Sequence, residues 1–243
     1  MALVDDFKKS IYKENLFDEH KQSVVLVEKQ NKEENKKQDK LKTSNFRLEE
    51  VTLNYNGSII QIANRFLEET SKIYKSSKSE RELSFSNVCD GILFVEKEGK
   101  IYLIIIEMKS GFGEIVKAVK QIVASYVKIK QFLLSLKSYN PDDYEERALI
   151  FSYPFDTKTP VPADIQPSQR KSDVMENGLS SFADRIKYNI RKNHKVVLNF
   201  NDIQGTDLIN IDESLCPVKL SIRHIELEKG TKIASENLND ILC

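Results

Sequence analysis

Two continuous apolar runs, separated by a short charged segment, are the clearest pattern in the chain. They cover residues 91–95 and 101–106, and the segment between them contains Gly99. Runs of this length around a glycine-containing turn are typical of a β-hairpin. We therefore predict a hairpin whose turn centres on Glu98 and Gly99.

A long amphipathic helix is predicted directly after this hairpin, beyond a short connection at residues 110–113. Apolar residues recur there at intervals of three and four, the period of a helix that packs one side on a sheet. This apolar stripe consists of Ile115, Val119, Ile122, Tyr126, Ile129, Leu133 and Leu136. Tyr126 is therefore expected in the core. A polar stripe of the same period consists of Lys117, Gln121, Ser125 and Lys128.

Further apolar patterns on both sides of the hairpin complete one candidate core. Residues 58–75 are expected to form a helix capped by Ser58, and residues 82–88 a strand. Residues 147–153 read as another buried strand, which the long helix could connect in parallel to the second hairpin strand. The predicted order over residues 58–154 is thus helix, three strands, helix, strand.

The flanking segments have weaker patterns. Residues 1–57 should form an N-terminal extension that packs on the core, and residues 155–243 a C-terminal extension of the same domain. The polar segment 28–42 is expected to be a solvated loop. Helices are expected at 3–17 and 178–193, and strands at 23–27, 46–55, 195–200 and 218–227.

The composition fits a soluble globular protein. Of the 243 residues, 40% are hydrophobic and 30% are charged, so the chain can form a substantial core. No run approaches the roughly 20 apolar residues that cross a bilayer, and no secretory signal is visible. The three scattered cysteines are expected to be free thiols, so we predict a cytoplasmic protein without membrane association.

Charge gives only local support for a nucleic-acid partner. The 37 basic and 37 acidic residues cancel, whereas nucleic-acid-binding proteins commonly carry a basic excess. Lysines nevertheless outnumber acids over residues 109–137, and a second basic cluster lies at 185–195. Each cluster is equally well explained as a solvated helix face.

Candidate chemistry lies at the open end of the hairpin. With the predicted turn, Asp90 lies opposite Glu107, and directly opposed residues have Cβ atoms roughly 4.5–5.5 Å apart. Strand alternation places Lys109 on the same face as Glu107. Two adjacent carboxylates repel unless a cation lies between them, and Mg²⁺ prefers such oxygen ligands. A nearby lysine could orient an attacking water.

This arrangement resembles the PD-(D/E)xK nuclease superfamily. The matching residues are Asp90 in CDGILF, Glu107 and Lys109 in IIIEMKSG, and Gln121 in KAVKQIVASY. Cys89 replaces the usual proline. The resemblance implies an α/β fold of the restriction-endonuclease type, with three α/β/α layers and a central mixed sheet. It also implies that Asp90 and Glu107 bind Mg²⁺ or Mn²⁺ and that Lys109 and Gln121 are catalytic.

The implied function is hydrolysis of phosphodiester bonds in nucleic acid, with DNA favoured over RNA. Lys117, Lys120 and Lys128 could then contact the phosphate backbone. Members of this superfamily that cut both strands often work as homodimers. Many also use a further acid, for which Glu69 and Glu82 are the candidates in this chain.

Two alternatives remain open at this point. The chain could use a nuclease-like fold as a catalytically inactive module that binds nucleic acid or protein. Alternatively, Glu107 and Lys109 could form a structural ion pair only. His20, His194 and His224 lack the short spacings of metal ligands, so we expect surface or core roles for them.

Overall fold

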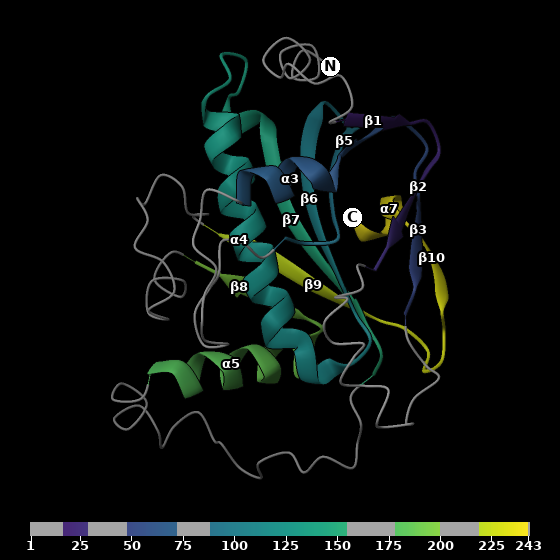
Figure 1. The fold of residues 1–243 in the computed structure, drawn as a ribbon, viewed down its shortest axis with the longest axis vertical. Coiled ribbons are helices and arrows are strands. Elements are labelled where there is room, and N and C mark those ends of the chain that lie inside the picture. Colours follow the sequence, from purple (N-terminus) through teal and green to yellow (C-terminus); the bar gives the residue numbers. More distant parts are fainter. Residues whose placement is uncertain (1–16, 29–47, 72–87, 155–177, 200–218, 243) are drawn as a thin grey trace.

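Two stacked β-sheets form the centre of the structure, and the larger helices lie on one outer side of them (Figure 1). The structure, a computed structural model, describes residues 17–28, 48–71, 88–154, 178–199 and 219–242. The protein is thus mixed α/β with a large mixed sheet, as the sequence predicts.

The larger sheet has seven strands in the order β1-β4-β5-β6-β7-β9-β8. Strands β6, β7 and β9 are parallel to one another, and the other neighbours pair antiparallel. The strands are β1 (Phe17–His20), β4 (Ile59–Ile62), β5 (Gly91–Lys97), β6 (Lys100–Lys109), β7 (Tyr144–Ser152), β8 (Lys195–Leu198) and β9 (Leu220–Glu226).

The β5–β6 hairpin forms with the predicted turn. Lys97 pairs with Lys100, so the turn contains only Glu98 and Gly99. Their φ angles are 54° and 80°. Two-residue hairpins favour such positive φ angles because the resulting twist matches that of the strands. This local geometry fixes the register of the whole hairpin.

Helix α4 (Ile115–Leu134) makes the predicted crossover from β6 to the parallel strand β7. Its apolar stripe packs on the sheet, and Tyr126 is fully buried, with its hydroxyl donating to Glu146 at 2.8 Å. Helices α3 (Asn64–Ser71) and α5 (Gly178–Asn193) lie beside α4 (Figure 1). Among the described residues, no helix has the length and apolar character to span a membrane.

The opposite face of the large sheet is covered by a second sheet rather than by the helical layer that we expected. Its strands are β2 (Ser23–Val27), β3 (Glu50–Asn54) and β10 (Ile233–Asn237), in the order β10-β3-β2. Alternate apolar residues of these strands, with the short helix α7 (Leu238–Ile241), pack on β5, β6 and β7. In the described part of the chain the layers are therefore α/β/β, which corrects the α/β/α prediction.

The start of the candidate core also differs from the prediction. Residues 59–62, expected as the first turn of a helix, form strand β4, which pairs with β5. Three isoleucines in these four residues favour an extended backbone. Helix α3 begins only at Asn64, so a strand precedes the helix. The strand expected at 82–88 lies outside the described residues except for Val88, which is not in a strand.

The contact between the two sheets predicts the effect of one substitution. A Cβ atom at Gly91 would lie 2.8 Å from a methyl carbon of Leu26 on β2, whose side chain is itself buried. Gly91→Val should therefore lower the free energy of unfolding by about 1–3 kcal/mol through overpacking. Urea denaturation measures this change. Gly113→Ala is the matched control because nothing lies within 4 Å of its new Cβ, and equal effects of both substitutions would contradict the proposed steric cause.

Candidate metal and catalytic site

Asp90, Glu107 and Lys109 lie at the open end of the hairpin, where their charges act on one another. The pairing of β5 with β6 ends at Gly91 and Ile106, and Asp90 and Glu107 are the next residue on each side. The backbone N–H of Asp90 donates to the carbonyl of Ile106 at 3.0 Å, so Asp90 bonds to the residue that already pairs with Gly91, as in a β-bulge. All three side chains are buried, and Glu107 has no exposed surface. Charged groups are rarely buried together unless they are paired or bind a ligand.

Each carboxylate has a partner at one of its oxygens. The Asp90 carboxylate accepts a hydrogen bond of 2.7 Å from the Met108 backbone N–H. Lys109 Nζ forms an ion pair with Glu107 Oε1. The second oxygen, Glu107 Oε2, is buried without a hydrogen-bond partner. Unsatisfied buried oxygens are uncommon, and this one is a vacant donor atom for a cation.

The electrostatics of this site favour added positive charge. Burial raises the pKa of Glu107 well above its usual range, and the neighbouring Asp90 raises it further, against the opposing effect of Lys109. Burial alone would lower the pKa of Lys109, but the charges of Glu107 and Asp90 leave it raised, so the ammonium persists. One ammonium thus faces two carboxylates, and a divalent cation would stabilise the ionised form of both.

Helix α4 holds the segment that leads into Asp90. Gln121 Nε2 donates to the Val88 carbonyl at 3.3 Å, and the Cys89 backbone N–H donates to Ser125 Oγ at 2.9 Å. Gln121 and Ser125 are one helical turn apart, so they bind consecutive residues of the segment. Gln121 Oε1 is buried without a hydrogen-bond partner. Gln121 therefore contacts the backbone that positions Asp90, and its carbonyl oxygen remains available near the site.

The three lysines proposed to contact phosphates differ in exposure. Lys117 is exposed and forms a 3.8 Å ion pair with Glu114. Lys120 is half-buried, and burial lowers its pKa. Lys128 is only 4% exposed. The polar stripe of α4 that contains Lys128 is partly buried, because α4 packs against β6, α3 and α5. Lys128 is therefore not exposed at the surface.

Neither candidate for a further acid is placed in the site. Glu69 forms an ion pair of 2.9 Å with Arg65, one turn earlier on helix α3. Glu82 lies outside the described residues. The group that the structure brings together is therefore the carboxylates of Asp90 and Glu107 with the ammonium of Lys109.

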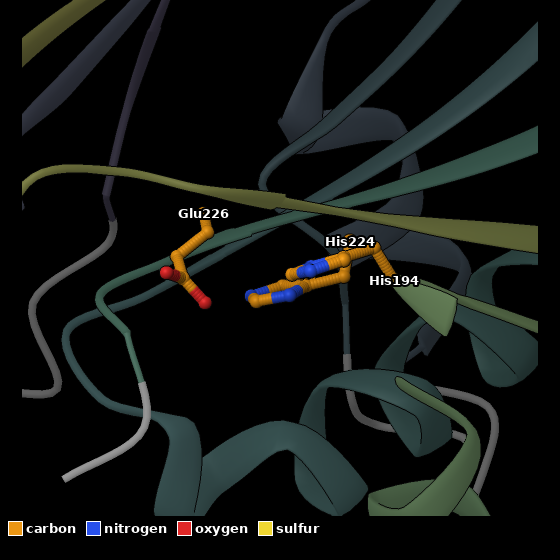
Figure 2. A group of neighbouring side chains, drawn as sticks. All are labelled: His194, His224 and Glu226. Carbon is orange, nitrogen blue, oxygen red and sulfur yellow. The ribbon is translucent and has the colours of Figure 1, made fainter. Parts of the chain in front are cut away.

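A second polar group lies on the same face of the sheet, and sequence reasoning missed it. Glu107 is in register with Ile150 and, on the next strand, with His224. Lys109 is likewise in register with Ser152 and Glu226. His194 joins His224 and Glu226 from the segment between α5 and β8 (Figure 2). His194 and His224 are distant in sequence, so no local spacing could have indicated this group.

Burial also changes the chemistry of His224. The side chain is 3% exposed, and burial, together with the neighbouring His194, lowers the pKa of His224 to about 4. Its imidazole is therefore neutral near pH 7.

Comparisons with known proteins do not assign the chain to a family. No protein-family model matches it, and no curated protein or solved structure is significantly similar to it. A functional conclusion must therefore come from the chemistry of the two polar groups.

Proposed function

We propose that the protein is a metal-dependent nuclease that hydrolyses phosphodiester bonds of nucleic acid. The observation that carries this proposal is the buried Glu107 Oε2, which has no hydrogen-bond partner and belongs to a carboxylate that interacts electrostatically with Asp90. A buried pair of carboxylates with an unsatisfied oxygen has the donor chemistry that Mg²⁺ and Mn²⁺ prefer. Such an ion supplies Lewis-acid activation of a phosphate and of the attacking water.

Each residue of the site has its own proposed role in hydrolysis. Asp90 and Glu107 Oε2 would hold the cation, while Glu107 Oε1 keeps its ion pair with Lys109. The Lys109 ammonium would orient the water and offset the negative charge that develops on the phosphate. The water oxygen would form the new bond to phosphorus and release a proton to solvent, while the bond to the leaving ribose oxygen breaks and that oxygen takes up a proton from solvent. Gln121 positions the segment that carries Asp90.

The arrangement of elements supports the resemblance to PD-(D/E)xK nucleases. Strands β5 and β6 form an antiparallel hairpin next to β4, and α4 then leads to the parallel strand β7. Nucleic acid, with DNA favoured, is the proposed substrate. Lys117 on α4 and the exposed Arg185, Lys187 and Lys192 on α5 are candidates to contact its backbone.

Metal removal tests the proposal. Purified protein should cleave DNA or RNA when Mg²⁺ or Mn²⁺ is present, and chelation should abolish cleavage because the buried carboxylates then lack their cation. Asp90→Asn should also abolish it, whereas Asp18→Asn, on an exposed position of β1, should not. Gel assays with single- and double-stranded substrates measure the activity. Equal cleavage by wild type and Asp90→Asn would show that the activity comes from another site or a contaminant.

A second candidate is a nuclease-like binding module without catalysis. The Glu107–Lys109 ion pair favours it, because this pair neutralises two members of the site without a cation. Calorimetry with Mn²⁺ separates the two functions. Wild-type protein that binds nucleic acid but neither binds Mn²⁺ nor cleaves would support the module and exclude the nuclease.

A further inference from the structure

His194, His224 and Glu226 gather at one end of strand β9. One potential ligand atom from each residue lies within 4.8 Å of the others. The two rings lie one above the other, and the Glu226 carboxylate points toward their edges (Figure 2). Two imidazoles and one carboxylate at such separations could all reach one metal ion after small side-chain adjustments.

The backbone fixes the two histidines relative to each other. The His194 N–H donates to the Ile190 carbonyl at 2.9 Å, and the His224 N–H donates to the His194 carbonyl at 2.8 Å. His194 has a φ of 49°, the left-handed conformation that turns the chain from α5 into β8. The two imidazole rings then stack, with 5.9 Å between their centroids and 8° between their planes. This preformed geometry would reduce the entropic cost of ligand binding.

The hydrogen bonds of His224 leave one ring nitrogen as a vacant ligand. The Ser152 hydroxyl lies 3.2 Å from the Tyr153 carbonyl and 2.8 Å from His224 Nε2. With the imidazole proton on Nε2, Ser152 can accept from His224 and donate to that carbonyl, and Nδ1 then keeps its lone pair. Nδ1 is buried without a hydrogen-bond partner. Histidines that bind metals typically donate their other ring N–H in this way, which fixes the tautomer and the ring orientation.

We propose that His194, His224 and Glu226 form a binding site for one divalent transition-metal ion of the zinc class. Imidazole nitrogens favour Zn²⁺, Co²⁺ or Ni²⁺, whereas Mg²⁺ prefers oxygen ligands. Two histidines and one glutamate leave one position of a tetrahedral site open, as in catalytic zinc sites. The exposed side chains of His194 and Glu226 place that position toward solvent.

This site is separate from the carboxylate pair at the hairpin. His224 lies two strands from Glu107 in the same register, about 10 Å at the usual strand spacing. The two sites also differ in ligand chemistry, so the zinc-class site does not depend on the proposed nuclease function. A bound ion would connect the α5–β8 junction to β9 and should raise the melting temperature.

Metal titration of the purified, metal-free protein tests this site. Wild type should bind one Co²⁺ that shows the visible absorption of nitrogen-ligated cobalt, and Zn²⁺ should displace this ion. His194→Asn, chosen because asparagine tolerates the left-handed backbone, and Glu226→Gln should each weaken binding by more than about tenfold. His20→Asn is the matched control, because His20 lies on β1 and contacts Gln61. Circular dichroism establishes that each variant is folded.

The outcomes separate the two sites. Glu107→Gln should leave Co²⁺ absorption unchanged if the ion binds at His194, His224 and Glu226. Absence of Co²⁺ and Zn²⁺ binding by wild type would overturn the proposal. Equal affinity of wild type, His194→Asn and Glu226→Gln would also overturn it, as would loss of Co²⁺ binding in Glu107→Gln alone.

Discussion

Glu107→Gln is expected to reduce metal-dependent cleavage by roughly a thousandfold or more, because it removes a charged metal ligand at the reacting centre. The amide has nearly the same shape as the carboxylate, so it should fit a side chain that has no exposed surface. The oxygen of the new amide can still accept a hydrogen bond from Lys109. The amide NH₂ group, however, takes the place of the unpaired Glu107 Oε2 and cannot bind a cation. Activity should therefore be lost while the fold is kept.

Initial cleavage rates at saturating Mn²⁺ measure this effect, with Mn²⁺ affinity measured in parallel by calorimetry. Glu96→Gln is the matched control because Glu96 lies on β5 of the same hairpin, at an exposed position. Both variants should show wild-type circular dichroism. A Glu107→Gln rate within a few-fold of wild type would show that this carboxylate is not part of the nuclease site.

Lys109→Met should lower kcat by about a hundredfold or more, because the proposed water-orienting ammonium is lost. Mn²⁺ binding should persist or become tighter. The positive charge of Lys109 repels a nearby cation, and methionine removes both that charge and the ion pair with Glu107 Oε1. The metal-free variant should be less stable than wild type, since Glu107 is then buried without its counterion. Added Mn²⁺ should restore much of that stability.

Rates, Mn²⁺ affinity and melting temperature together identify the role of Lys109. Lys100→Met is the control at the opposite end of β6, where the lysine is exposed and pairs with Glu145 at 2.9 Å. A catalytic lysine predicts lost turnover with retained Mn²⁺ affinity. Unchanged turnover in a folded Lys109→Met protein would mean that the ion pair is structural only.

The features that the sequence predicts correctly are those that local patterns determine. A two-residue turn sets the hairpin register, and that register brings Asp90 and Glu107 to the same end of the hairpin. Helices α4 and α5 and strand β7 follow from apolar periodicity over many residues. The sequence predicts a helix at residues 59–62, where β4 forms, because four residues are too few to distinguish the helical period of 3.6 from the strand period of 2.

The features that the sequence does not predict depend on distant pairings. Strand β10 (IASEN) has little apolar character, and its place beside β3 comes from tertiary packing. The second sheet, and with it the α/β/β layering, could not be foreseen from such a pattern. His194 and His224 likewise become neighbours only because β8 pairs with β9. Candidate sites formed by one hairpin are therefore visible in sequence, whereas sites formed across β8 and β9 are not.

The pairing of β10 with β3 also has a consequence for the order of folding during synthesis. Asn54 Nδ2 donates to Ser235 Oγ at 2.9 Å across 181 residues of chain. The hairpin that carries Asp90 and Glu107 leaves the ribosome long before residue 235. Until β10 is synthesised, the three-stranded sheet is incomplete, and the apolar face of the hairpin that packs on it is only partly covered. Nascent chains should therefore need protection from aggregation over this interval, because exposed strand edges and apolar surface invite wrong pairing.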